Sequence, residues 1–481
     1  MNQKNNHMHS FFMKMKWFVL AVFMSSSVLC FGQDTLRTLN AEQVFQIVKK
    51  YHPIVKQSQL QIENAQANLL NARGSFDPII NTYISRKTFG GKEYYNQITP
   101  EIEIPTWYGI ELYTGIQNLT GAKLDPSETS GQSNYVGISI PLAKDLIFDK
   151  RRAQLRQAQI FKSLASVEQQ KMINDLLMES MDAYWSWVKA YQSYQIVSAN
   201  VEVTKKRTDL IVRSFVNGER AAIDTVEAMT QLQSFLYQQA QAKLAFQNAG
   251  LQLSSYLWTE NETALILTEF VIPDTTWDNP SLFSSFNIVL DDLLNAADKN
   301  HPTLKSYDYK IDALVVEKRL KFQELLPKID FRYNQLSKGY NPINSLISGP
   351  VFENNFQYGI KFQMPLSFSS GRANYKMAKI KIENTSLEQV QKRIAIQLKI
   401  KSYFNEFIYL KNQIELQTNN YQYNLQLVKA EEYRYFNGES SLFLVNAREN
   451  KSLEALEKLI DLKTKYYNTI YALQWSAGLL F

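Results

Sequence analysis

Two short stretches, Phe215-Val216-Asn217-Gly218-Glu219 and Tyr435-Phe436-Asn437-Gly438-Glu439, decide the fold of this 481-residue chain. Each places an Asn-Gly pair at the end of a long run without proline, which is typical of a helix C-terminus followed by a reversal. No Pro occurs in residues 142–272 or in residues 366–481. Because an interior proline costs a helix about 3 kcal/mol, gaps of this length predict very long helices.

Each half of the chain is predicted to contain a long helix, a tight turn and a shorter return helix of ~39 residues. The first long arm, residues 149–216, would measure about 100 Å at ~1.5 Å per residue. Apolar residues step by three and four along both arms, with polar residues interspersed, so we expect apolar flanks and a third face in water. The two series are Leu164, Val167, Lys171, Asn174, Met178, Met181, Trp185 and Val188, and Leu387, Val390, Ile394 and Leu398.

The segments between these helices alternate with a period of two, which is typical of half-buried strands. The alternating segments are residues 108–117, 136–142, 329–334 and 356–366. In a transmembrane barrel the apolar face of such strands meets lipid and the polar face lines the lumen, although a soluble antiparallel sheet alternates in the same way. The first half is longer than the second at this point, and residues 90–105 and 121–133 are its extra residues. They predict an additional hairpin or longer loops, giving up to six strands in all.

The order of motifs is repeated once along the chain. Tyr51-His52-Pro53 recurs as Asn300-His301-Pro302, and Asp77-Pro78-Ile79 has a counterpart in Leu326-Pro327-Lys328. We therefore predict two structural repeats, residues 33–272 and 273–481, each with a helix, strands, a long helix and a return helix. The paired His-Pro dipeptides are expected to mark helix boundaries rather than a metal site.

Residues 1–32 are predicted to be a secretory signal peptide. Lys4, Lys14 and Lys16 precede the apolar run Trp17–Phe31, and Gly32 offers a small residue for cleavage. Removal of this segment lowers the formal net charge from +6 to +3. No later stretch approaches the ~20 apolar residues of a transmembrane helix, so entry into a membrane would have to be as a β-barrel.

The composition argues against an enzyme and against a nucleic-acid-binding protein. The chain contains four His and one Cys, and Cys30, His7 and His9 all lie in the predicted signal peptide. This makes a Cys/His zinc site, a disulfide scaffold and a Cys–His nucleophile implausible, and no phosphate-binding or nucleophile motif is present. A charge of +6 without a basic cluster is too small for a nucleic-acid binder. We expect no catalytic residues, no metal and no cofactor.

A further pair of motifs, Pro141-Leu142 and Pro365-Leu366, ends a strand before each long helix. Together with the duplicated order, the His-Pro dipeptides and the two Asn-Gly turns, these pairs resemble the TolC-like outer membrane efflux family over essentially the whole mature chain. This resemblance implies a mainly α fold with a membrane β-barrel portion: a trimeric channel-tunnel built from duplicated strand pairs and long antiparallel helices. It implies four strands per copy and a homotrimer in the outer membrane, in contact with lipid, with its helices in the periplasm. The function implied is that of a passive exit duct for a tripartite efflux or type I secretion system, served by a periplasmic adaptor (a membrane fusion protein) and an inner-membrane pump. The alternative is a periplasmic adaptor or a structural coiled-coil protein of the cell envelope.

The resemblance also points to functional residues near the two turns. The periplasmic tip that would dock an adaptor comprises Asn217, Gly218, Glu219, Asn437, Gly438 and Glu439. Family members carry an acidic ring near the second tip, but the matching position here is Lys429. The tunnel constriction is therefore expected among the neighbouring residues Glu431, Glu432, Tyr433, Arg434 and Tyr435.

Overall fold

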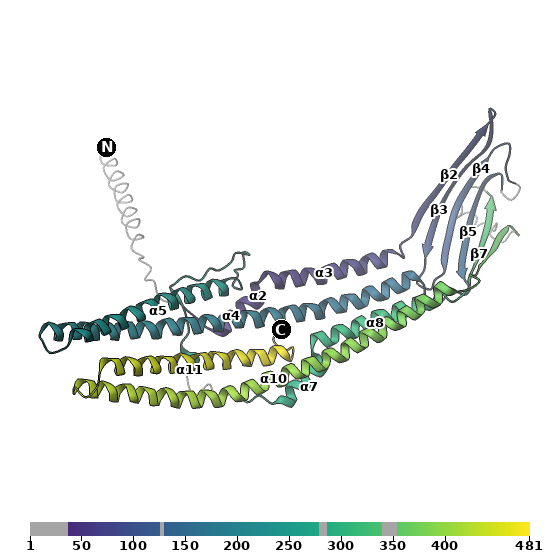
Figure 1. The fold of residues 1–481 in the computed structure, drawn as a ribbon. Helices are drawn as coiled ribbons and strands as arrows, with labels where there is room; N and C mark the ends of the chain where they lie inside the picture. Colours follow the sequence, from purple (N-terminus) through teal and green to yellow (C-terminus); the bar gives the residue numbers. More distant parts are fainter. Residues whose placement is uncertain (1–36, 126–128, 279–285, 339–353) are drawn as a thin grey trace, which may run out of the picture.

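Long helices run side by side along most of the molecule, and a curled antiparallel sheet stands at one end (Figure 1). The computed structural model describes residues 37–125, 129–278, 286–338 and 354–481. The predicted signal peptide, residues 1–32, lies outside the described residues. Both halves of the chain contribute helices to the body and strands to the sheet.

Two helices run the length of the body, α4 (Lys150–Val216) with 67 residues and α10 (Ser369–Phe436) with 68. At ~1.5 Å per residue each is about 100 Å long, as predicted. The return helices α5 (Ala222–Ser254) and α11 (Leu442–Ser476) have 33 and 35 residues and are shorter than expected. In the second half the reason is the start of another helix: a Cβ on Gly478, just after α11, would lie 2.6 Å from Cδ of Pro302.

Two further helices continue the return helices toward the sheet. Helix α8 (Pro302–Gln323) begins beside the end of α11, and α3 (Pro53–Gly74) begins near the end of α5, where the ring of His52 stacks on Tyr256 with centroids 6.1 Å apart. The body therefore has four helical tracks: α3 with α5, then α4, then α8 with α11, and then α10. Helix α4 packs against the tracks on both sides of it, whereas α10 packs mainly against the α8–α11 track and α7. The α3–α5 track and α10 are thus the two edges of the helical layer.

The two His-Pro dipeptides lie at helix boundaries, as predicted. Helices α2 (Ala41–Tyr51) and α7 (Leu290–Asn300) end at His52 and His301. The same residues cap the next helices: Nδ1 of His52 accepts a hydrogen bond from the Ile54 N–H at 3.2 Å, and Nδ1 of His301 accepts one from the Thr303 N–H at 3.1 Å. The proline that follows each His occupies the first helical position, where its missing N–H costs nothing.

A strap of short elements crosses the middle of the helices. We define the strap as β1 (Arg37–Leu39), α2, β6 (Val271–Pro273), the 3-10 helix η1 (Thr276–Asp278) and α7, with β1 and β6 paired in parallel. The largest buried cluster lies between the strap and the helices. In this cluster Trp185 of α4 stacks on Tyr467 of α11 with ring centroids 5.0 Å apart, and Trp277 of η1 meets Trp185 edge-on at 5.9 Å.

The sheet contains six described strands in an unbroken antiparallel meander. Their order is β2 (Ile79–Phe89), β3 (Lys92–Pro105), β4 (Glu111–Thr120), β5 (Gly131–Pro141), β7 (Lys328–Lys338) and β8 (Phe356–Gln363). The first half supplies four strands and the second half two, so the surplus residues of the first half do form an additional hairpin. The four alternating segments correspond to β4, β5, β7 and β8, the surplus residues 90–105 contain β3, and β2 lies where no alternating segment was predicted; the total is six, whereas the resemblance had implied four.

The alternation of side chains gives the sheet one apolar and one polar face. The register pairs Ile102 of β3 with Thr114 of β4, and Ile138 of β5 with Tyr333 of β7. Glu101 and Glu103, the neighbours of Ile102, and Arg332, the neighbour of Tyr333, lie on the opposite face. Because a shift by one residue changes the face of every side chain, the apolar pattern fixes the register of the meander.

The two helical series predicted from the sequence differ in their surroundings. Seven of the eight residues in the first series, on α4, are buried; Lys171 is the exception. In the second series, Leu387, Val390, Ile394 and Leu398 of α10 are 52–64% exposed. Both series lie on helices, as expected, but the second has no apolar partner within the described part of one copy.

Candidate functional site

Both predicted tips are tight helix C-terminal reversals. Gly218 and Gly438 have φ of +79° and +78°, the left-handed conformation that glycine adopts at little cost. The Glu219 N–H donates to the Ser214 carbonyl at 2.9 Å, and the Glu439 N–H donates to the Arg434 carbonyl at 2.8 Å. This is the Schellman pattern of hydrogen bonds, and it ends α4 and α10 at Asn217 and Asn437. All six predicted tip residues are exposed.

The two reversals are joined by a small apolar cluster. Buried side chains from α4, α5, α10 and α11 form it: Ile211, Ala228, Tyr435, Leu442 and Val445. The Arg220 guanidinium lies 4.4 Å from the centroid of the Tyr435 ring, so the first tip also contacts the second through a cation–π interaction. The tip is therefore a single packed unit contributed by both repeats.

A largely buried guanidinium joins three helices just above this cluster. Arg207 of α4 donates from Nη1 to Oε2 of Glu449 on α11 at 2.7 Å, and its Nη2 also contacts Oε1 of the same carboxylate. Nη2 donates in addition to Oε1 of Glu432 on α10 at 3.2 Å. The side chains of Arg207 and Glu449 are only 16% and 12% exposed, so water screens this interaction weakly. Arg207 thus holds α4 against the α10–α11 pair.

Glu431 is the other acid that holds the second tip together. Its Oε1 accepts a hydrogen bond from Oγ of Ser440 at 2.5 Å, across the reversal. Arg434 and Arg448 lie 3.6 and 3.8 Å from its carboxylate oxygens, and the carboxylate itself is buried. Glu431 therefore connects the end of α10 to the loop that begins α11.

The five predicted constriction residues have different environments. Glu431 and Tyr435 are buried in the tip, and Glu432 is partly buried against Arg207. Tyr433 and Arg434 are exposed. Arg207 and Glu449, which complete the network, were not predicted, because 242 residues separate them and no local motif marks a pair that forms only when two helices meet.

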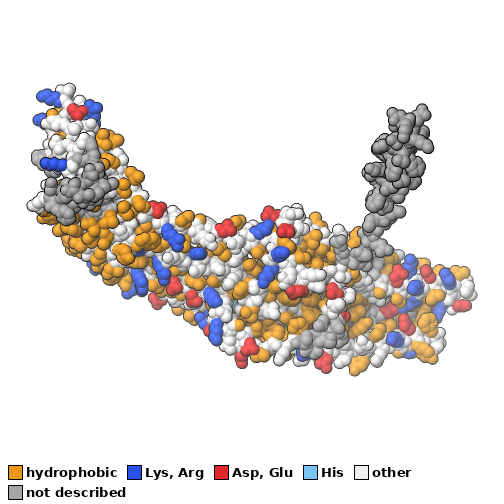
Figure 2. All heavy atoms as spheres, turned by 180° about the vertical axis from the view of Figure 1, so that it is seen from behind, with side chains coloured by type: hydrophobic (Ala, Val, Ile, Leu, Met, Phe, Trp, Pro, Cys, Tyr) orange, Lys and Arg blue, Asp and Glu red, His pale blue; other side chains and the backbone are white. Residues whose placement is uncertain are grey.

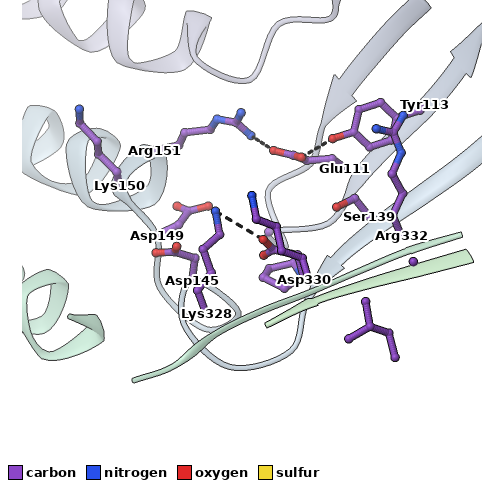
Figure 3. Close-up of a pocket in the computed structure, with 15 residues that line it drawn as sticks. Glu111, Tyr113, Ser139, Asp145, Asp149, Lys150, Arg151, Lys328, Asp330 and Arg332 are labelled. Carbon is purple, nitrogen blue, oxygen red and sulfur yellow. Dashed lines mark hydrogen bonds and ion pairs between the residues drawn. The ribbon is translucent and has the colours of Figure 1, made fainter. Parts of the chain in front are cut away.

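The polar face of the sheet carries a second network of charges, at the end nearest the helices (Figure 3). Arg151, in the first turn of α4, donates to Oε1 of Glu111 at 2.8 Å and lies 3.7 Å from Glu103. Oε2 of Glu111 accepts a hydrogen bond from the Tyr113 hydroxyl at 2.5 Å. These bonds join the β3–β4 hairpin to the start of α4.

The same network extends across the sheet to the second repeat. Arg332 of β7 donates to Oε2 of Glu101 on β3 at 2.9 Å, and this carboxylate oxygen also accepts from the Tyr135 hydroxyl at 2.5 Å. The Arg332 guanidinium lies 4.3 Å from the centroid of the Tyr113 ring. A hollow of about 540 Å³ opens between these side chains and the residues that lead into α4. The polar face is thus rich in paired charges of both signs.

The opposite face of the sheet is apolar and exposed. Figure 2 shows hydrophobic side chains gathered over the sheet on the side of the molecule that it draws. The residues concerned include Ile80, Ile84, Ile98, Ile102, Ile104, Leu112, Val136, Tyr358, Ile360 and Phe362. An apolar surface that spans several strands and lacks a covering layer marks an interaction surface rather than the outside of an ordinary soluble domain.

None of the described helices combines the length and the apolar character that a bilayer span requires. Over the described ranges, no group of three or more His, Cys, Asp or Glu side chains is placed to hold a metal ion.

Comparison with known proteins places these features in context. The model of the outer membrane efflux protein family matches residues 108–257. No curated protein sequence matches the chain. Among solved structures, the outer-membrane channel OprN is 15% identical, with a TM-score of 0.64 over 91% of this chain and 89% of its own.

Two further solved channels have a similar fold. The CmeC outer membrane channel of Campylobacter jejuni is 16% identical, with a TM-score of 0.63 over 92% of this chain and 86% of that one. The outer membrane protein VceC of Vibrio cholerae is 12% identical, with a TM-score of 0.62 over 91% and 96%. At this level of identity the comparisons establish the arrangement of helices and sheet.

Proposed function

We propose that the chain, which has a TolC-like fold and matches the outer membrane efflux protein family over residues 108–257, is a member of that family, and that three copies assemble into one continuous exit duct. As a family member the chain is a transport conduit and not an enzyme, located in the outer membrane with its helices in the periplasm. The proposal adds the number of copies, the way they join and the role of the tip. It also adds the partners: a periplasmic adaptor and an inner-membrane pump.

One observation carries the proposal. Among the described residues, the outer strands of the sheet and the outer helices of the body have neighbours on one side only. Strands β2 and β8 each pair on one side only among the described strands. Because a membrane interior offers no water to satisfy open N–H and C=O groups, a sheet in lipid must close on itself. One copy supplies only an arc, so other copies must supply the rest.

The directions of the edge strands are compatible with closure. Strand β2 leaves the helices after α3, and β8 returns to them before α10. A β8 edge placed against the β2 edge of a neighbouring copy would therefore form another antiparallel pair, which continues the meander. Three copies would give 18 strands, an even number as in bacterial outer membrane barrels.

The helical edges carry matching apolar surfaces. On α10, Leu387, Val390, Ile394 and Leu398 are exposed at spacings of three and four. On the α3–α5 track, exposed apolar residues include Leu60, Leu70, Tyr237, Leu244 and Leu251. Packing α10 of one copy against this track of the next would bury both stripes. Four tracks from each of three copies would make a wall of twelve.

The arrangement argues against the adaptor or coiled-coil alternative. An adaptor would place a compact β-rich module between one pair of helices. Here strands follow α3 and also α8, at equivalent places in the two halves, and these six strands join in one sheet. The apolar face of this sheet suits contact with outer membrane lipid.

At the other end of the body, the tip supports docking and gating. The six exposed residues of the two reversals, Asn217, Gly218, Glu219, Asn437, Gly438 and Glu439, would form the surface that meets the adaptor. The ion pairs of Arg207 with Glu432 and Glu449 would hold the helix pairs together while the duct is closed. Opening then requires these pairs to separate.

Cysteine cross-linking tests the assembly. Cys30 is the only Cys and lies in the predicted signal peptide, so a mature chain would contain none. We would combine Ser85→Cys on β2 with Gln357→Cys, Gly359→Cys or Lys361→Cys on β8 in separate variants. These positions lie on the polar face of the two edges. Oxidation should link copies into dimers and trimers in at least one variant.

Gln117→Cys on β4 with Lys361→Cys is the matched control, because β4 lies inside the sheet and should form no link between copies. Detergent-solubilised protein of monomeric mass, together with no intermolecular product in any edge variant, would refute the trimer.

A further inference from the structure

A cleft with an excess of positive charge lies where α8 begins and α11 ends. Asn174 of α4 ties this junction together: its Nδ2 donates to the Trp475 carbonyl at 3.1 Å, and its Oδ1 accepts from the Leu480 N–H at 3.0 Å. Beside it is a cleft of about 240 Å³, lined by residues of α4, α8, α10 and α11. Its walls therefore come from three of the four helical tracks.

Three lysines line the cleft, Lys171 from α4 and Lys392 and Lys399 from α10. None of the three forms an ion pair within the described residues, whereas nine other lysines do. Asp175 is the one acid among the lining residues, and its Oδ1 already accepts a hydrogen bond from Nε1 of Trp475 at 2.7 Å. The cleft thus has two more positive than negative charges.

Contacts inside the cleft keep its positively charged groups close to one another. The Lys399 ammonium lies 3.4 Å from the centroid of the Trp475 ring, a cation–π contact that fixes its direction. Burial lowers the pKa of Lys399, with Lys392 adding to the effect and Asp175 opposing it. Burial likewise lowers the pKa of the adjacent His301 to about 4, with Asp175 opposing the effect and the three lysines adding to it, so the imidazole is neutral at pH 7. An anion in the cleft would relieve the repulsion among the ammonium groups.

The helical positions place the α4 side of the cleft away from β1 of the strap, whereas His301, at the end of α7, lines another side of the cleft. The Tyr184 hydroxyl donates to the carbonyl of Leu39 in the strap at 3.4 Å. Asp175 precedes Tyr184 by nine residues, or two and a half turns, which puts it on the opposite side of α4. Lys171 lies one turn before Asp175 and shares its side. In the proposed assembly we orient each copy with β1 of the strap on the outside of the wall, so that this side of α4 faces the interior of the tunnel.

We propose that the cleft is a binding site for a phosphate-sized oxyanion and that its threefold repetition forms a cationic belt inside the duct. Three ammonium groups, the amide of Asn174 and the indole of Trp475 surround a space large enough for such an ion. The class of cargo that this belt favours is anionic. The belt rests on the proposed trimeric duct, whereas the binding site itself needs only one folded copy.

Binding of inorganic phosphate tests the site. The detergent-purified protein is titrated with phosphate against chloride at constant ionic strength, and tryptophan fluorescence is followed because Lys399 lies on the Trp475 ring. The wild type should give a saturable change. Lys392→Gln with Lys399→Gln should weaken the apparent affinity by about tenfold or more, since two charged donors are lost.

Lys49→Gln on α2, an exposed lysine of the strap, is the matched control, and Lys392→Arg keeps the charge in the cleft. Both should retain binding, and unfolding curves establish that every variant is folded. An absence of saturable change in the wild type, or equal affinity in the double variant, overturns the site.

Ion selectivity in planar bilayers tests the belt separately. Under a salt gradient, the reversal potential of the double variant should shift toward cation selectivity relative to Lys49→Gln. Equal reversal potentials overturn the role of the belt in transport. A protein that conducts but does not bind phosphate refutes the site and leaves the duct standing, whereas a monomer that binds phosphate refutes the duct and leaves the site standing.

Discussion

At the tip, the guanidinium of Arg207 is shared by carboxylates from two other helices, and this arrangement is sensitive to the loss of one partner. Removing one member of a buried pair leaves an uncompensated charge, which costs about 3–5 kcal/mol, more than the pair itself contributes. The carboxylates of Glu449 and Glu432 would repel each other once the guanidinium was gone. If α4 and α5 then separated from α10 and α11, water could reach both carboxylates.

Arg207→Met is therefore expected to open the tip and raise the conductance of the protein in planar bilayers. Arg213→Met is the matched control, since Arg213 is an exposed residue of α4 for which the described residues offer no ion pair. Adding Glu449→Gln to Arg207→Met should restore part of the low conductance, because one uncompensated charge is removed. A conductance unchanged by Arg207→Met would contradict the gating role.

A pH dependence of stability is expected from His301. Its pKa is lowered from 6.5 to about 4, mainly by burial, so between these values the unfolded chain binds more protons than the folded one. The stabilisation is complete above pH 6.5 and is lost as the pH falls toward 4. Protonation would also place a hydrogen on Nδ1 and abolish the cap on Thr303. The free energy of unfolding should fall by about 3 kcal/mol over this range.

His301→Asn is the control for this prediction, because Asn is a strong N-cap residue that does not titrate. Denaturant unfolding of both proteins at several pH values gives the comparison, and the background from other groups, His52 included, should cancel in the difference. Identical pH profiles would show that His301 does not titrate in this way.

At the scale of elements, alternation and helical spacing predicted type and length well, because each reflects the contrast between two faces of one element. Strands β4, β5, β7 and β8 and both long helices lie where these patterns placed them, whereas no pattern predicted β2. The patterns do not reveal what covers an apolar face. Val188 on α4 is buried by the same chain, whereas Leu398 on α10 is exposed, although the spacing around each is alike.

Ile394→Asp combined with Leu398→Asp is expected to abolish the trimer while leaving the single copy folded. Both side chains are exposed in one copy, and a charge buried at the contact between copies would remain unpaired. Mass measurement in detergent gives the oligomeric state, and circular dichroism gives the helix content. Gln391→Asp, an exposed polar position on the same helix, should leave the trimer intact. A double variant that remains trimeric would place the contact elsewhere.

At the scale of the whole molecule, the additional hairpin changes the dimensions of the proposed duct. The resemblance implied four strands per copy, and the described sheet has six. The surplus was visible in the sequence as extra residues in the first repeat. Its place within the sheet was not, because the four strands of the first repeat join those of the second through the pairing of β5 with β7, which brings together residues distant in sequence, such as Ser133 and Lys338. The same limit hid Arg207 and Glu449 at the tip.

Three copies should therefore form a barrel about half as wide again as one of 12 strands, since diameter grows roughly in proportion to strand number. Electron microscopy of the purified assembly in detergent or lipid measures this width at the end opposite the tip. A barrel of 12-strand width would mean that the β3–β4 hairpin lies outside the wall. Deletion of that hairpin offers a second measurement, because the width should then shrink.

The unpaired edges of β2 and β8 also bear on biogenesis. A solitary newly exported chain that entered the bilayer would carry open backbone groups into hydrocarbon, and each such group costs several kcal/mol there. Encounter of the partners must then precede insertion, or accompany it. Because that encounter depends on concentration, halving the rate of synthesis would reduce the inserted amount by more than half.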